Sequence, residues 1–401
     1  MGTDVSIQAD PGVARPATGG AAGWLPRDAA WSDSRRAILL MGDSLDRGGT
    51  EGQFVEIATR LDRSRWNVHV SCLRAEGPLR ARLEQAGVRA WSCGRGSLKS
   101  PSVLPAILEL ARYLRRSRIR VVHSFDFYSN ILGVLAARLA RVPAVIASQR
   151  DLGDLRRWPD RRVHSLMLRL ADRVLVNSQA VADRLTVHRA LARRIVLIPN
   201  GVDLVRFSPP PGPTGRRSGR VTVGTLANLR PEKGLADFVR AAALVRERCP
   251  DVRFVVWGEG PRRPHLERLV AQLGVGGTVE LRGSTAEPEV ELRKLDIFVL
   301  PSLSEACSNG LLEAMATGLP VVTTNVGGNA SLVEDEVTGL LVPPGDSRSI
   351  ATAIVRLIQT PAFAAELAAR GRDRLQATFG MDRMVARVEA LYGGTLAGSR
   401  R

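Results

Sequence analysis

The chain has 401 residues, more than one hydrophobic core usually serves, so its length predicts two or three domains. Its 44% hydrophobic and 24% charged residues exclude a wholly disordered chain and a polytopic membrane protein. A formal net charge of +17 favours anionic partners: phosphorylated substrates, acidic lipid surfaces or nucleic acid.

The excess of positive charge lies in the first half of the chain. Residues 1–210 carry 33 basic and 19 acidic side chains, a net +14, whereas residues 211–401 carry 24 and 21, a net +3. Only three of the basic residues are lysines: Lys99, Lys233 and Lys294. A general preference for arginine throughout the chain is therefore the alternative to a functional basic surface.

The beginning of the chain and the cysteines bear on its location. Residues 1–34 are rich in Gly, Ala, Pro and Asp without an uninterrupted apolar segment, so we expect a disordered tail rather than a secretory signal. The four cysteines, at 72, 93, 249 and 307, form no C-x-x-C pair and predict neither a disulfide framework nor a zinc site. No stretch reaches the roughly 18 apolar residues of a membrane span. We expect a cytoplasmic protein, with a peripheral position on the inner face of the membrane as a further expectation.

From residue 36 onward, short apolar runs alternate with segments of helical period, which indicates β-α units and a parallel sheet. The predicted strands lie at 37–41, 68–73, 121–123, 144–147, 174–176 and 195–198. The predicted helices between them include 51–61, 104–114 and 131–140.

A linker rich in Pro and Gly over 208–219 separates this series from a second one. Strands are then predicted at 221–225, 253–257, 279–281, 297–300 and 321–323, with helices at 235–246 and 264–273. Apolar residues at helical spacing from Met381 to Tyr392 predict an amphipathic helix near the end of the chain. Two doubly wound α/β domains in tandem place the ligand site in the cleft between them, at the carboxyl ends of the strands.

The segment 304–320 carries the strongest chemical pattern. Glu305 lies on the loop after a strand, and Glu313 lies eight positions later inside a helix that starts near Asn309. The start of this helix offers free N–H groups to an anion. Carboxylates on both sides of a phosphate site suit a sugar nucleotide, Glu313 binding the ribose and Glu305 the sugar; a solvated helix residue is the alternative for Glu313.

Two further loops follow strands. Arg230 and Lys233 bring two cations to a strand end, where a diphosphate leaving group needs its charge neutralised; a solvated surface turn is the alternative. Gly48 and Gly49 follow the first strand and allow backbone N–H groups to approach a phosphate. A tight turn is the alternative there and at Gly258.

Together these segments resemble the family-4 retaining glycosyltransferases, the group 1 glycosyl transferases of the GT-B fold. The segments, in the order that the family shows, are 48–51, 198–203 with Phe207, 230–234, 258–261, 305–313 and 314–320. Each motif alone is weak, whereas the set in order is specific and covers residues 36 to about 395.

The resemblance implies two Rossmann-like domains that face a central cleft. Residues 35–207 would form the acceptor domain and residues 220–375 the domain that binds the nucleotide sugar. A helix over 376–395 would cross back to the first domain.

The implied activity is transfer of a hexose, with retention, from a UDP- or GDP-sugar to a glycan or lipid-linked acceptor, in cell-surface polysaccharide or glycolipid synthesis. The family needs no metal or other cofactor, and no D-x-D stands at a strand end here. The leaving diphosphate is thought to deprotonate the acceptor on the same face of the sugar. A sugar-nucleotide epimerase or a phosphorylase-type enzyme on the same architecture is the alternative.

The resemblance also assigns residues. It implies that Glu313 holds the ribose, Glu305 lies near the donor sugar, Lys233 binds the diphosphate with Arg230, and Gly49 belongs to a loop that closes over it. The remaining donor contacts that it implies are Gly48, Asn228, Gly258, Gly283, Ser308, Asn309, Gly310 and Leu311.

The sequence departs from the family on the acceptor side and at one phosphate contact. Asn228 stands where an arginine is common, so Arg230 is expected to replace it. Ala306 and Ser331 replace a glycine and a glutamate, and residues 149–151 (Gln-Arg-Asp) stand where some members have a histidine. His123 ends a strand and is a candidate catalytic contact, with a structural histidine as the alternative.

Basic side chains around the helix at 104–114 and at 156–162 favour contact with an anionic membrane, with a solvated face as the alternative. Nucleic-acid binding is not expected, because no recognised motif is present and aromatic residues make up only 4%.

Overall fold

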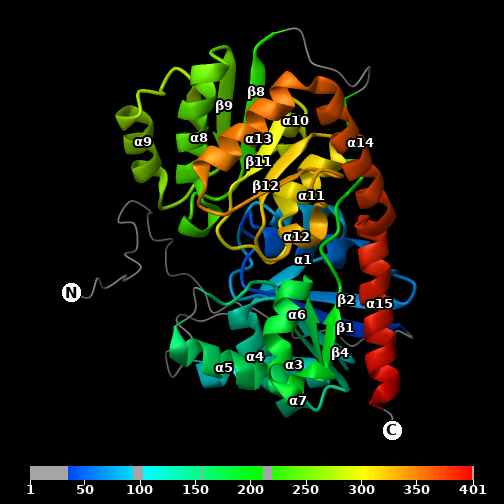
Figure 1. Ribbon diagram of the computed structural model, residues 1–401. Helices are drawn as coiled ribbons and strands as arrows, with labels where there is room; N and C mark the ends of the chain where they lie inside the picture. The colour runs from blue at the N-terminus through cyan, green and yellow to red at the C-terminus, as the bar shows by residue number, and fades with distance from the viewer. Residues whose placement is uncertain (1–34, 94–102, 155–156, 211–218, 400–401) are drawn as a thin grey trace, which may run out of the picture.

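The computed structural model describes residues 35–93, 103–154, 157–210 and 219–399. The tail predicted over 1–34 and residues 211–218 of the predicted linker lie outside the described residues. Two lobes, each built on a parallel sheet, make up the molecule (Figure 1). The predicted fold class, two Rossmann-like α/β domains, is thereby confirmed.

The first sheet has seven parallel strands in the order β3-β2-β1-β4-β5-β6-β7. Its strands are β1 (Arg36–Gly42), β2 (Trp66–Cys72), β3 (Ala90–Ser92), β4 (Val121–Ser124), β5 (Ala144–Gln149), β6 (Arg173–Val176) and β7 (Ile195–Leu197). Its helices are α1 (Gly49–Arg60), α2 (Arg80–Gln85), α3 (Val103–Arg116), α4 (Phe127–Ala140), α5 (Trp158–Leu170), α6 (Gln179–Thr186) and α7 (Arg189–Ala192). The order reverses between β1 and β4, the point at which doubly wound sheets open a ligand crevice.

The second sheet has six parallel strands in the order β10-β9-β8-β11-β12-β13. Its strands are β8 (Val221–Leu226), β9 (Val252–Trp257), β10 (Val279–Arg282), β11 (Ile297–Leu300), β12 (Val321–Thr324) and β13 (Leu340–Val342). Its helices are the 3₁₀ turn η1 (Pro231–Lys233), α8 (Leu235–Arg248), α9 (Arg263–Gln272), α10 (Pro288–Leu292), α11 (Asn309–Ala316), α12 (Asn329–Leu332), α13 (Ser347–Gln359) and α14 (Pro361–Thr378).

Every strand predicted from the sequence is present within two residues at each end. These strands are continuous apolar runs because helices cover both faces of a parallel sheet, and their side chains are almost all buried. The edge strands β3 and β13 were not predicted. Each has only three residues, although β7, an edge strand of the same length, was predicted from its apolar run.

The chain crosses between the lobes twice, and the two crossings lie side by side. Val202 donates its N–H to the Phe379 carbonyl at 2.9 Å, and the Met381 N–H donates to the Val202 carbonyl at 3.0 Å. Arg60 of α1 pairs with Asp203 on one crossing and with Asp382 on the other. These contacts join the two crossings to each other and to α1 at the point where the chain passes between the lobes.

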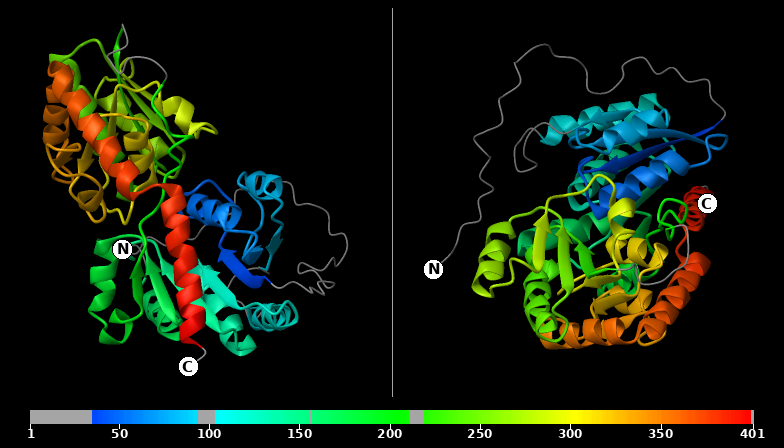
Figure 2. Two further views of the ribbon diagram at one scale, coloured as in Figure 1. Left: turned by 90° about the vertical axis from the view of Figure 1, so that its right-hand side faces the viewer. Right: turned by 90° about the horizontal axis from the view of Figure 1, so that it is seen from above.

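The last helix, α15 (Met381–Gly398), runs from the second lobe down the side of the first (Figure 2). Residues 376–378, predicted to begin this helix, instead form the last turn of α14. Met384, Val388 and Tyr392 of α15 pack in one core with Phe54 of α1 and with the first sheet.

In the part of the chain that the structure describes, no single helix is both long and apolar enough to cross a membrane. Only α13 and α14 taken together, a pair bent by 104°, reach that length and composition.

Candidate active site in the interdomain cleft

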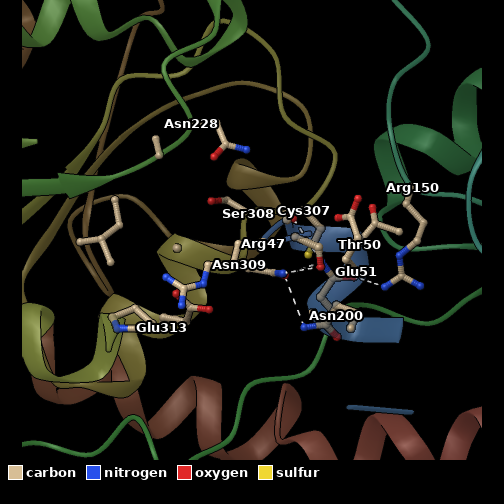
Figure 3. A pocket seen from close by; sticks show the side chains of 18 of the residues that line it. Arg47, Thr50, Glu51, Arg150, Asn200, Asn228, Cys307, Ser308, Asn309 and Glu313 are labelled. Carbon is tan, nitrogen blue, oxygen red and sulfur yellow. Dashed lines mark hydrogen bonds between the residues drawn. The ribbon is translucent and has the colours of Figure 1, made fainter. Parts of the chain in front are cut away.

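A cleft of about 1020 Å³ lies between the lobes, at the carboxyl ends of both sheets (Figure 3). Residues that the sequence placed in a donor site line it from both sides. They are Gly48, Gly49, Asn228, Arg230, Lys233, Gly258, Glu305, Ser308, Asn309, Gly310 and Glu313.

An ion pair between Lys233 and Glu305 occupies the wall formed by the second lobe. Lys233 Nζ lies 2.5 Å from Glu305 Oε1, and the Ser302 hydroxyl donates to the same oxygen at 3.0 Å. Lys233 ends the turn η1, and Gly234 follows with φ of +62°. A Cβ at Gly234 would lie 2.0 Å from the Pro301 carbonyl oxygen, so only glycine lets this turn approach the loop that carries Glu305.

Glu313 lies on α11, and burial raises its pKa to about 7. Glu289 adds to this increase, whereas Arg206 opposes it. Arg206 is itself paired with Glu289 at 2.8 Å, so it does not fully neutralise Glu313. A buried carboxyl without a dedicated partner is suited to accept hydrogen bonds from a ligand.

The start of α11 faces the cleft between these two glutamates. Ser308 is the N-cap, and its hydroxyl accepts the Leu311 N–H at 3.3 Å, which leaves the first N–H groups of the helix directed at the cleft. Leu311 does not line the cleft, because its side chain is fully buried in the core of the second lobe. Gly283, another predicted donor contact, does not line the cleft either, although Gly258 and Ser284 do. Its carbonyl accepts the Gly258 N–H at 3.2 Å.

Asn228 and Arg230 lie on the exposed loop after β8. Gly258, with φ of +154°, supports this loop, since a Cβ there would lie 2.0 Å from the Ala227 carbonyl oxygen. Burial raises the pKa of Glu51 on α1, the nearby Asp43 adds to this increase, and the guanidinium of Arg230 opposes it from across the cleft.

The glycine-containing loop of the first lobe, residues 46–49, touches the second lobe. Arg47 Nη1 donates to the Thr285 carbonyl at 2.7 Å, and Asn309 Nδ2 donates to the Gly49 carbonyl at 2.8 Å. The loop thus reaches the second lobe beside the start of α11, as Figure 3 shows for Arg47 of the loop and for Thr50, which follows it.

The opposite wall of the cleft carries Arg150 and Asp126, at the carboxyl ends of β5 and β4. Arg150 Nη2 donates to Asn200 Oδ1 at 2.6 Å, and its guanidinium lies 5.6 Å from the centre of the Phe125 ring. Burial, with Asp43 close by, raises the pKa of Asp126 well above its usual range. This wall is therefore polar, with the guanidinium of Arg150 held by neighbouring side chains.

His123 does not reach the cleft, so it is withdrawn as a catalytic candidate. Its side chain is fully buried, with Nδ1 at 2.7 Å from the Tyr392 hydroxyl and Nε2 at 2.8 Å from the Ser148 hydroxyl. Burial lowers its pKa well below the usual value, so the ring is neutral. The residue joins β4 to α15, which covers it, and acts as a structural histidine.

Sequence reasoning gave no site role to Arg47, Arg150 or Asn200. Arg150 was noted only as a departure from the family, and Asn200 only as part of the 198–203 motif. Their contacts join residues more than 45 positions apart, so no local spacing could reveal them. Among the residues that the structure describes, no three His, Cys, Asp or Glu side chains are grouped so that they could hold a metal.

The residues that match models of known protein families make up most of both lobes. Residues 47–206 match the model described as Glycosyltransferase Family 4, and residues 220–360 match the model described as Glycosyl transferases group 1. The first match contains every strand of the first sheet except β1, and the second contains all six strands of the second sheet.

Individual proteins agree with this result. The chain is 31% identical to a D-inositol 3-phosphate glycosyltransferase of Salinispora tropica, over 95% of this chain and 88% of the relative. It is 26% identical to the UDP-Gal:alpha-D-GlcNAc-diphosphoundecaprenol alpha-1,3-galactosyltransferase of Escherichia coli, over 83% and 90% of the two chains. Its fold matches the crystal structure of Anabaena Alr3699/HepE in complex with UDP-glucose, with a TM-score of 0.80 and 22% identity over 89% and 99%.

Sequence family, fold and cleft agree, and the chain belongs to the family-4, group 1 glycosyltransferases of the GT-B fold.

Proposed function

We propose that this glycosyltransferase moves a hexose, with retention and without a metal, from a UDP-sugar to a hydroxyl of a glycan or lipid-linked acceptor. The observation that carries the proposal is the Lys233–Glu305 pair beside the start of α11, with Glu313 on the same helix. UDP is favoured over GDP because the similar Anabaena structure holds UDP-glucose and the Escherichia coli relative is named for UDP-Gal.

Each group has a role that follows from its charge and position. The Glu313 carboxylate accepts hydrogen bonds from the ribose hydroxyls. The N–H groups at the start of α11 and the ammonium group of Lys233 neutralise the diphosphate, with Arg230 at the rim as a second cation. Glu305 holds the Lys233 ammonium in place and accepts hydrogen bonds from the sugar.

In the transfer step, the bond between the anomeric carbon and the diphosphate oxygen breaks, and the acceptor oxygen bonds to the same face of that carbon. The acceptor proton passes to the leaving phosphate, so atoms and charge balance without an enzyme nucleophile. The cations that stabilise the departing diphosphate then supply most of the protein's contribution, because charge develops there in the transition state.

The first test is thermal stabilisation of the full chain by UDP, GDP and ADP. A nucleotide at about one hundred times its dissociation constant adds roughly 2.7 kcal/mol to folding stability. A shift with UDP alone supports the proposal, and a shift with GDP alone changes the donor base. If no nucleotide shifts the melting temperature, the donor site is refuted.

Product analysis separates transfer from its alternative. An epimerase converts a UDP-sugar into an isomeric UDP-sugar without an acceptor, whereas a transferase releases UDP only as a new glycoside forms. Glu313→Ala and Lys233→Ala are expected to abolish transfer while the fold persists. Lys294→Ala, at an exposed lysine outside the cleft, is the matched control.

We also propose that the first lobe rests on an anionic membrane in the cytoplasm, where a lipid-linked acceptor for cell-surface polysaccharide or glycolipid synthesis would lie. Helices α3, α4 and α5 pack side by side on one face of the first sheet (Figure 1). Trp158 (65% exposed), Leu104 (60%) and Leu166 (52%) are apolar side chains on this layer. The exposed arginines around them are Arg112, Arg115, Arg116, Arg161 and Arg162.

The position of this surface supports a lipid-linked acceptor. Asp154 lines the cleft, and the exposed Trp158 opens α5 only four positions later. All four cysteines are free thiols, which suits a reducing compartment.

Co-sedimentation with phosphatidylcholine vesicles, with and without phosphatidylglycerol, tests the membrane proposal. Binding should require the anionic lipid and should weaken in Trp158→Ser and Arg116→Glu, but not in Arg268→Glu on α9. Equal binding to both vesicle types, or none, would refute it.

A further inference from the structure

The side chain of Asn309, the first residue of α11, is directed to the first lobe (Figure 3). Its Nδ2 donates to the Gly49 carbonyl at 2.8 Å, and its Oδ1 accepts from Asn200 Nδ2 at 2.7 Å. A second amide donor, Gln53 Nε2, lies 3.5 Å from the same Oδ1. Because N–H groups face Oδ1 and a carbonyl faces Nδ2, only one orientation of this amide fits.

Asn200 is held from several sides and is 4% exposed. Its Nδ2 also donates to the carbonyl of Cys307, just before the N-cap of α11, at 3.2 Å. Its Oδ1 accepts from Arg150, on the wall of the cleft that the first lobe forms, at 2.6 Å. A single side chain at the crossing therefore contacts this wall and the residue that precedes the N-cap of α11.

Gly201, the residue after Asn200, is also held by hydrogen bonds from the first lobe. Gln53 of α1 donates to the Gly201 carbonyl at 2.8 Å and accepts the Gly201 N–H at 3.0 Å. A Cβ at Gly201 would lie 2.9 Å from Met381 Cα, so the crossing packs directly against the start of α15. The position of Asn200 is thus set by the first lobe and by both crossings.

We propose that Asn200 and Asn309 form an interdomain clamp that positions the glycine loop, residues 46–49, beside the donor diphosphate. The proposal deepens the proposed function, on which it rests for the identity of the donor. Asn309 holds the loop directly. Asn200 is a positioning residue that acts through Asn309 and gives its amide the required orientation.

The clamp matters because the loop's other side-chain restraint within the first lobe, the ion pair of Asp46 with Arg74 at 3.0 Å, is exposed. Gly48 and Gly49 carry no side chains, and the second contact to the other lobe, from Arg47 to the Thr285 carbonyl, is exposed. A Cβ at Gly49 would lie 3.3 Å from Asn309 Nδ2, a tight contact, so the loop packs closely against the start of α11. Fixing the loop before the donor binds removes an ordering cost that binding would otherwise bear.

Substitutions of nearly equal shape test the clamp. Asn309→Asp replaces the N–H that faces Gly49 by an oxygen, and two acceptors then oppose each other. Asn200→Asp keeps the oxygen that accepts from Arg150 but places an oxygen against Asn309 Oδ1 and the Cys307 carbonyl. Asn309→Ala removes the contacts without adding repulsion and remains informative if an Asp variant does not fold. Asn325→Asp, exposed and outside the cleft, is the control.

The first readout is hydrogen–deuterium exchange over residues 44–56 of the full chain without nucleotide. Asn309→Asp, Asn200→Asp and Asn309→Ala should each exchange faster there, the Asp variants by about tenfold or more, and the control should match the wild type. Unchanged exchange in the variants would overturn the proposal.

The second readout is steady-state transfer. The KM for the UDP-sugar should rise by about tenfold in each Asp variant, more than kcat falls, because the loss is in donor positioning. The double variant should resemble the single ones, since both residues act through one contact. Strictly additive effects would overturn the coupling. If the wild type binds no nucleotide, the proposed function fails, whereas the exchange result still decides whether the clamp exists.

Discussion

We expect the affinity for the donor to depend on pH through the ionisation of Glu313, and Glu313→Gln to remove this dependence. Its carboxyl, buried near Glu289, ionises at a pKa of about 7 in the folded protein. In the proposed donor site, ribose hydroxyls would donate to the charged carboxylate, so donor binding should favour the ionised form. Donor affinity should therefore increase as pH rises through 7.

The size of the effect follows from the pKa. At pH 6 about one tenth of the carboxyl is ionised, and at pH 8 about nine tenths, so affinity should increase by about tenfold, or roughly 1.4 kcal/mol. Isothermal titration calorimetry with UDP-glucose measures this change, because its diphosphate diester has no group that titrates in that range. Glu313→Gln should bind more weakly than the wild type at pH 8 and show no dependence on pH.

Folding stability should change in the opposite sense. The unfolded chain ionises Glu313 near 4.5 and the folded chain near 7, so the folded state binds the proton more tightly between these values. Stability then falls as pH rises from 4.5 to 7, by at most about 3 kcal/mol, and less of this fall should remain in Glu313→Gln. Urea denaturation at several pH values measures it.

Glu267→Gln, at an exposed side chain on α9, controls for the general effect of removing one charge. If the wild type binds UDP-glucose equally at pH 6 and pH 8, or if Glu313→Gln keeps the wild-type dependence, then Glu313 does not bind the ribose as a carboxylate.

Three further outcomes are expected. Lys233→Ala should lower kcat/KM by roughly 10²- to 10³-fold with little change in melting temperature, and a loss below tenfold would remove the lysine from the diphosphate site. His123→Ala should lower the free energy of unfolding by about 2–4 kcal/mol in urea titrations, while the folded protein keeps near-wild-type kcat; a selective loss of kcat would restore a catalytic role. Gly234→Ala should destabilise by about 2 kcal/mol or more, because its Cβ would meet the Pro301 carbonyl at a positive φ, whereas Gly276→Ala, which has open space, should not.

Much of the donor site was predictable because each of its parts is a continuous segment. Glu305 and Glu313 are eight positions apart on one loop and helix, and the turn that carries Lys233 begins five positions after the end of its strand. Local chemistry decides such geometry: a strand end, a capping serine and a helix start fix where the side chains lie. The acceptor wall was less predictable, since Arg150 and Asp126 follow different strands and meet only in the folded sheet.

His123 shows where sequence reasoning failed. Its place at a strand end suggested the cleft, but Tyr392, 269 positions later, covers it. The amphipathic pattern of 381–392 predicted a helix without saying which surface it would bury. The docking of α15 on the first lobe decided that His123 is structural.

By itself, the sequence determined the two series of strands and helices and the family, and it predicted a donor side of the cleft, because apolar periodicity and short motifs act over a few residues. Only the tertiary structure decided the contacts of Asn200 with Asn309 and of Arg47 with Thr285, which join residues 109 and 238 positions apart. Such contacts depend on how the two sheets are placed relative to each other where the chain passes between the lobes. No local spacing encodes that arrangement.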